Sequence, residues 1–181
     1  MNSKTRGSFE LSAIKRAEYA SEAISGSADV EKSIAGLRSI PRGGSSETVE
    51  IRELEIAAVA APMKQDHAKA IELMKQATIL EEALGPPSGP PGLVKPSHEL
   101  FGEILLRAGK AAEAAEQFKA ALLRQPNRAR SLLGAARAAA KSGDQRGAAS
   151  AYARLLEQWK QADEGLPELR EAREYLKQAK P

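Results

Sequence analysis

The amino-acid sequence predicts an all-α fold, and three observations support this class. Hydrophobic residues make up 42% of the chain but aromatic residues only 4%, and alanine runs such as Ala138–Ala140 supply much of that content. Alanine is the best helix former and loses no side-chain entropy in a helix. Sheets favour β-branched and aromatic residues, so this composition is poorly suited to a sheet. The third observation is that the apolar residues recur at helical spacing and that the pattern repeats along the chain.

The repeat has a period of 34 residues in the C-terminal half. Two sets of positions share the same size classes in the same order: Phe101-Gly102, Gly109, Ala114, Phe118 and Ala121, and then Ala135-Ala136, Gly143, Ala148, Tyr152 and Leu155. Repeats of this length are helix–turn–helix units that stack into a solenoid. We therefore expect a solenoid of helical hairpins, and the family resemblance described below implies that it is right-handed.

Residues 1–46 predict a pair of helices without a convincing repeat register. Phe9, Ile14 and Ile24 indicate the first helix, and Ile34 and Leu37 indicate the second. We interpret this segment as a degenerate repeat or a partly disordered one.

Residues 47–84 predict a divergent hairpin, because Ala57-Ala58, Ala70 and Met74 match the register if ten residues are inserted after them. The insertion is the loop at 85–95, where residues 85–92 are glycine and proline except for Ser88. Such a segment neither continues a helix nor pairs in a sheet, so we expect an extended spacer.

Two further hairpins are predicted at 96–127 and 128–163. Pro96 suits a first helical turn, Gly109 separates the two helices, and Pro126 ends the second one. In the next hairpin Asp144 is a good helix N-cap after Gly143. No proline closes this unit, so we expect its second helix to run through Trp159 to about Asp163.

The last predicted element is a capping helix at 166–180. Leu169, Ala172 and Leu176 form an apolar stripe. Two heptads are too few for an independent coiled coil, whereas a solenoid needs a terminal helix over its last apolar face.

The pattern resembles the tetratricopeptide repeat family. Phe101-Gly102, Ala114, Phe118, Ala121 and Pro126 match its small, aromatic and closing proline positions, while His98 and Leu105 replace its usual Trp and Tyr. The block from Gly85 to Leu100 is also similar to the C-terminal portion of longer bacterial tetratricopeptide proteins of unassigned function. The resemblance implies a short or truncated relative with a binding role and no catalytic residue.

No residue pattern indicates an enzyme. His98-Glu99 begins like a zinc-protease helix, but Gly102 stands where the second histidine is required. The chain has no cysteine, so a thiolate metal site is excluded. The glycines form no phosphate-binding pattern, and we expect no catalytic residue, metal or cofactor.

The candidate binding residues are charged residues of the first helix in each hairpin, because the resemblance implies that these helices line a concave groove. They are Glu99, Glu103 and Arg107 in one hairpin and Arg130, Arg137 and Lys141 in the next. Arg130, Arg137 and Lys141 stand at i, i+7 and i+11, so they share roughly one face of their helix. The family's carboxylate clamp is not reproduced, since Glu99, Glu103, Leu133 and Arg137 occupy its positions.

These residues predict a protein-interaction scaffold that binds a peptide or protein surface, with an acidic peptide as the specific hypothesis. Nucleic acid is less favoured, because basic and acidic residues are interleaved and no aromatic stacking platform accompanies them. The alternative is a self-assembly module or a regulatory module of a larger protein, which would make the chain a homo-oligomer or the partner of another domain. No apolar run reaches the ~20 residues of a membrane span, and we expect no membrane contact and a cytoplasmic location.

Overall fold

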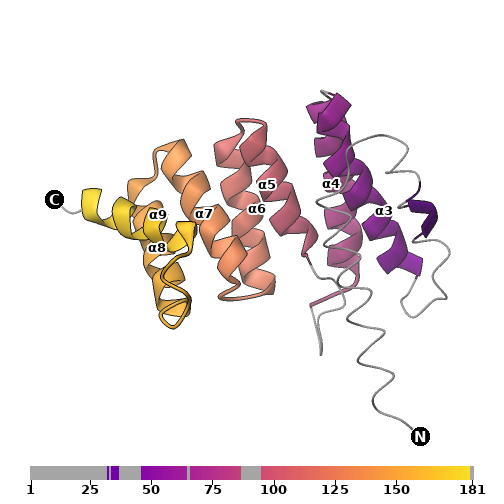
Figure 1. The fold of residues 1–181 in the computed structure, drawn as a ribbon. Coiled ribbons are helices and arrows are strands. Elements are labelled where there is room, and N and C mark those ends of the chain that lie inside the picture. The colour runs from indigo at the N-terminus through magenta and orange to yellow at the C-terminus, as the bar shows by residue number, and fades with distance from the viewer. Residues whose placement is uncertain (1–31, 33, 37–45, 65, 87–94, 180–181) are drawn as a thin grey trace, which may run out of the picture. The chain divides into compact units, whose positions relative to one another are not determined.

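The structure is a computed structural model that describes residues 32, 34–36, 46–64, 66–86 and 95–179, and every regular element among them is a helix (Figure 1). The elements are α3 (Ser46–Ala60), the 3-10 helix η1 (Ala61–Lys64), α4 (His67–Ala83), α5 (Ser97–Arg107), α6 (Ala111–Arg124), α7 (Ala129–Ser142), α8 (Gln145–Gln158) and α9 (Pro167–Gln178). The predicted all-α class is confirmed for this part of the chain. The predictions for 1–46 and for the loop at 85–95 fall mostly on residues outside it.

The chain divides into two compact units. Among the described residues, those up to Ala83 belong to the first unit, and Leu84 to Pro86 together with 95–179 belong to the second. In the first unit α3 packs against α4, and η1 contacts both. Ile51, Ala58, Ala70, Met74 and Ala77 are fully buried there. Small alanine side chains let two helix backbones approach closely, so this pair is held mainly by alanine, isoleucine and methionine packing.

In the second unit each helix from α5 to α9 packs against the next one along the chain, and α5 also contacts α7 (Figure 1). Only a few residues separate α5 from α6 and α7 from α8, so each of these pairs runs antiparallel. Since α5 also contacts α7, side chains on one of these two helices can contact side chains on the other.

The core of the second unit contains a phenylalanine between two glycines. Phe118 of α6 is 0% exposed. A Cβ atom on Gly102 of α5 would lie 2.8 Å from the Phe118 ring, and a Cβ on Gly134 of α7 would lie closer still. The two glycines therefore make room for one aromatic ring among three helices.

Glycines with positive φ end α5 and α7. Gly109 has φ 77° and Gly143 has φ 87°. The Lys110 N–H donates to the Leu105 carbonyl and the Asp144 N–H to the Ala139 carbonyl, each at 2.9 Å, which satisfies carbonyls that a helix end leaves open. The Asp144 side chain then accepts a hydrogen bond from the Gly147 N–H, so the predicted N-cap of the following helix is confirmed.

The predicted extension of α8 to about Asp163 is wrong, because the helix ends at Gln158. Trp159 leaves helical geometry with φ −106° and ψ 24°. Its side chain packs against the cluster of Leu132, Leu133, Ala136, Tyr152, Leu155 and Ala172. The chain turns at this point and returns as α9, which places Leu169 and Ala172 in buried positions.

Candidate functional site

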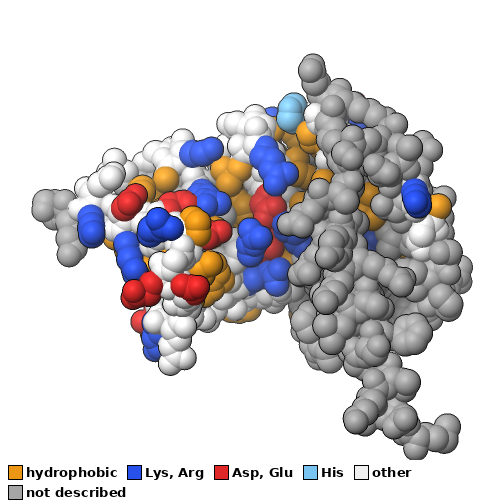
Figure 2. All heavy atoms as spheres, in the orientation of Figure 1, with side chains coloured by type: hydrophobic (Ala, Val, Ile, Leu, Met, Phe, Trp, Pro, Cys, Tyr) orange, Lys and Arg blue, Asp and Glu red, His pale blue; other side chains and the backbone are white. Residues whose placement is uncertain are grey.

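The six charged residues selected from the sequence lie on α5 and α7 and differ in exposure. Glu99 is 1% exposed. Glu103 and Arg137 are partly buried, whereas Arg107, Arg130 and Lys141 are exposed. We call the surface formed by the charged residues of these two helices the α5–α7 face. Figure 2 shows basic side chains gathered around a few acidic ones over these helices.

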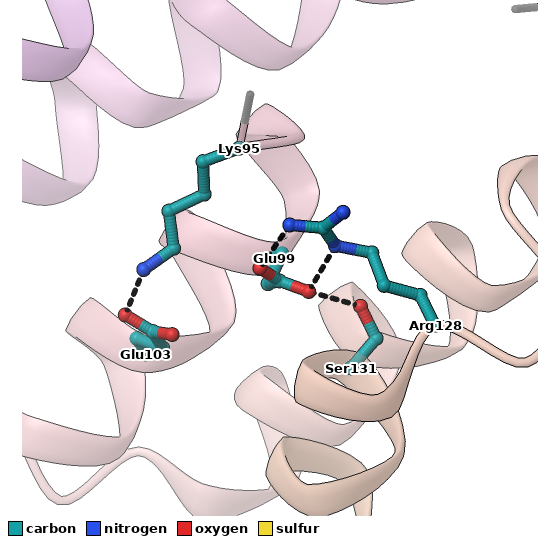
Figure 3. A network of polar contacts seen from close by, with 5 residues as sticks. All are labelled: Lys95, Glu99, Glu103, Arg128 and Ser131. Atoms are coloured by element: carbon teal, nitrogen blue, oxygen red, sulfur yellow. Dashed lines mark hydrogen bonds and ion pairs between the residues drawn. The ribbon is translucent and has the colours of Figure 1, made fainter. Parts of the chain in front are cut away.

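Glu99 connects α5 to the start of α7 (Figure 3). One carboxylate oxygen accepts hydrogen bonds from Arg128 Nε at 2.7 Å and from Ser131 Oγ at 2.6 Å. The other oxygen accepts from Arg128 Nη2 at 3.2 Å. A buried carboxylate needs such partners to offset the cost of its desolvation. Glu99 thus holds two helices together, and its carboxylate is not open to a ligand.

Glu103 makes a second internal ion pair one turn further along α5. Its carboxylate accepts a hydrogen bond from Lys95 Nζ at 2.6 Å (Figure 3). The two side chains are 22% and 33% exposed, respectively. Both acidic residues of the predicted site therefore have cationic partners within the chain.

Arg137 of α7 is held by Glu171 of α9. Arg137 Nε donates to Glu171 Oε1 at 2.8 Å and Nη2 donates to Oε2 at 2.6 Å. The Tyr152 hydroxyl of α8 donates to Glu171 Oε1 at 2.6 Å. Two parallel hydrogen bonds from one guanidinium give this pair a defined geometry as well as attraction.

The pKa values of the three groups follow from these contacts. The hydrogen bond from Arg137 lowers the pKa of Glu171 below its ordinary 4.5, and the hydrogen bond from Tyr152 acts in the same direction. The pKa of Arg137 is raised, chiefly by its hydrogen bond to Glu171. Burial and the hydrogen bond to Glu171 raise the pKa of Tyr152. At neutral pH the carboxylate and guanidinium are charged and the phenol is protonated.

Arg107, Arg130 and Lys141 remain as cations whose side chains make no hydrogen bond or ion pair with another described residue. Arg107 and Lys141 are 34 positions apart and lie in the last turns of α5 and α7. Arg130 lies in the first turn of α7. A helix rises ~1.5 Å per residue, so Arg130 and Lys141 are roughly 16 Å apart along the axis. The predicted row of three cations on α7 is thus interrupted by the paired Arg137.

Sequence reasoning did not select Arg128, Ser131, Tyr152 or Glu171. One sequence signal for Glu171 was present: it lies 34 residues after Arg137, a spacing equal to the repeat period, and it carries the opposite charge. For Tyr152, the 34-residue repeat identified an aromatic packing position, but it gave no sign of the hydrogen bond from the Tyr152 hydroxyl to Glu171.

A shallow, open hollow of about 440 Å³ lies along one side of α9, lined by Pro167, Arg170, Glu171, Glu174, Tyr175 and Gln178. The described residues contain no cluster of three or more His, Cys, Asp or Glu side chains that could hold a metal ion. None of the described helices is both long and apolar enough to span a membrane. No protein-family model matches the chain, and a comparison with curated proteins gives no match either.

Proposed function

We propose that the chain is a tetratricopeptide-like scaffold that binds an acidic peptide segment on the α5–α7 face. The repeat period supports this proposal, because it relates α5 to α7 and α6 to α8, and α5 packs against both α6 and α7. Contacts between alternate helices are what a solenoid of stacked hairpins requires. In such a solenoid α5 and α7 would be the first helices of two units and α9 the helix that caps them.

The observation that carries the proposal is the difference between the paired and the unpaired charges of this face. Glu99, Glu103 and Arg137 each have a partner of opposite charge within the chain. Arg107, Arg130 and Lys141 are exposed cations whose side chains have no polar contact with another described residue. The free charges of the α5–α7 face are therefore all positive, which favours a ligand that carries several carboxylates.

The affinity would come from several weak contacts. An exposed ion pair contributes about 0.2–1 kcal/mol, so three such pairs alone correspond to at most about a hundredfold in affinity. Binding of this kind weakens with added salt, because exposed charges are screened beyond about 10 Å at 0.1 M ionic strength.

The test compares two triple charge reversals. The first variant carries Arg107→Glu, Arg130→Glu and Lys141→Glu. The matched control carries Lys119→Glu, Arg146→Glu and Arg154→Glu, which reverse three exposed cations of α6 and α8. The probes are a fluorescent peptide of Glu and Asp residues and its Gln and Asn counterpart, and fluorescence anisotropy measures the affinity.

We expect the parent and the control to prefer the acidic peptide and the first variant to bind it at least about tenfold more weakly than the control. Circular dichroism checks that both variants keep the helical content of the parent. Equal binding by the two variants would show that general charge attraction, and not the α5–α7 face, holds the peptide.

A further inference from the structure

We propose that Arg137 and Tyr152 form a carboxylate-binding site that Glu171 of the same chain occupies, so that an acidic partner segment competes with Glu171 for it. This inference rests on the proposed function and names one position on the α5–α7 face where a carboxylate of the partner binds. Its consequence is that α9 limits the affinity of the face for an acidic ligand.

The contacts of Glu171 define the chemistry of the site. One carboxylate receives two hydrogen bonds from the Arg137 guanidinium and one from the Tyr152 hydroxyl. These donors come from α7 and α8, whereas the acceptor comes from α9. A fork of two N–H groups with an O–H beside it is complementary to a planar carboxylate, and any carboxylate placed there can accept the same three bonds.

The site is open to solvent on its Arg137 side, whereas Tyr152 is only 3% exposed. The Arg137 side chain is 42% exposed and the Glu171 side chain 34% exposed. Glu171 also lines the open hollow along α9. A carboxylate from another chain can therefore approach the guanidinium without first opening the core. When a partner carboxylate replaces Glu171, one ion pair with Arg137 is exchanged for another of the same kind. The two pairs differ mainly in that Glu171 belongs to the same chain as Arg137.

Apolar contacts also hold α9 against the second unit, and they do not involve Glu171. Leu169 is 1% exposed and Ala172 is 0% exposed. The Tyr175 ring packs against the Tyr152 ring with centroids 4.9 Å apart. Because apolar burial holds the helix in place, removal of the Glu171 carboxylate frees Arg137 and leaves α9 docked.

The experiment compares Glu171→Gln with Glu174→Gln in the full chain. Both substitutions remove one negative charge from α9, but Glu174 is exposed and its side chain has no polar contact with another described residue. The probes are the acidic peptide and its amide counterpart used above. We expect Glu171→Gln to bind the acidic peptide about tenfold more tightly than the parent and Glu174→Gln to stay within about twofold of it.

The double variant Arg137→Gln/Glu171→Gln identifies the group that the peptide uses. If it loses the gain of Glu171→Gln, the gain came from the freed guanidinium. Trp159 is the chain's single Trp and packs against the cluster that contains Ala172, so its fluorescence emission reports whether α9 stays docked. The outcome of the double variant decides the inference even if α9 is released in Glu171→Gln. A gain in affinity for the acidic peptide that persists in the double variant would overturn the inference. A gain that disappears would support it.

Failure of this inference is distinguishable from failure of the proposed function. Equal affinities of Glu171→Gln and Glu174→Gln would overturn the inference, even while the triple reversal of Arg107, Arg130 and Lys141 still weakens binding. If that triple reversal binds like its control, the proposed function itself fails.

Discussion

The Phe118 ring occupies the space that a side chain on Gly134 would need. Phe118 is 0% exposed, and a Cβ atom built on Gly134 overlaps the ring edge. Gly102 approaches the same ring from α5, where a Cβ would lie 2.8 Å from it. The ring is thus confined between two helices and cannot move away from one without approaching the other.

The first prediction is that Gly134→Ala destabilises the protein. Alanine in place of glycine gains ~1 kcal/mol of helix propensity, whereas overpacking a full core costs ~1–3 kcal/mol. Because Phe118 has no free direction to move, we place the overpacking cost in the upper part of that range, which leaves a net loss of about 1–2 kcal/mol. Urea denaturation followed by circular dichroism measures the free energy of unfolding.

The control for this prediction is Gly147→Ala. Its Cβ would meet the exposed Asp144 carboxylate, which can rotate away if it gives up the capping hydrogen bond from the Gly147 N–H. That loss of about 1 kcal/mol is close to the ~1 kcal/mol of helix propensity that alanine gains. We expect Gly147→Ala to be less destabilising than Gly134→Ala, and we expect Phe118→Leu to reduce the cost of Gly134→Ala in the double variant. An unfolding free energy of Gly134→Ala equal to that of the parent would contradict the packing described here.

The second prediction concerns Phe118→Ala. This substitution removes an aromatic side chain that contacts α5 and α7 and leaves a cavity beside two glycines, which have no side chains to fill it. We expect a loss of about 3–5 kcal/mol in the free energy of unfolding. A melting temperature within a degree or two of the parent would show that the ring contributes little.

The third prediction compares two glutamates of α5. Glu99→Ala removes the buried acceptor of Arg128 and Ser131, and we expect it to cost about 2–3 kcal/mol, because Ser131 is itself fully buried. Glu103→Ala removes the acceptor of Lys95 in a partly exposed pair and should cost less than about 1 kcal/mol. Denaturant titration of both variants measures the two losses in the free energy of unfolding. Equal losses would show that the burial of the carboxylate does not determine how much each ion pair stabilises the fold.

The fourth prediction is a pH dependence set by Glu171. The hydrogen bond from Arg137 lowers its folded-state pKa below the ordinary 4.5. The ionised carboxylate therefore stabilises the folded state above pH 4.5, and this contribution is lost as the pH falls from there through the folded-state pKa.

Unfolding free energies of the parent and of Glu171→Gln, measured from about pH 7 to about pH 3, test this prediction. We expect the parent to be the more stable protein at neutral pH and its advantage to shrink below pH 4.5. A constant difference across the range would mean that the ionisation of Glu171 is not linked to folding.

The sequence was sufficient to predict the all-helical class and the turn at Gly143-Asp144. Helix propensity, apolar spacing and capping are local properties that act within a few residues, so they can be recognised without knowing which helices meet. The end of α8 was predicted too late, because Trp159 leaves the helix to pack against a cluster that includes residues of α7 and α9. That contact is not local.

The sequence by itself determined which residues are charged and which helix carries each of them. Only the tertiary structure decided which charges are already paired. Arg137 and Lys141 both looked like free cations of α7, yet Arg137 lies beside Glu171, and Lys141 contacts no charged group among the described residues. The physical reason is that an ion pair depends on distance. Two charges separated by 34 positions interact only because the fold brings Glu171 of α9 beside Arg137 of α7.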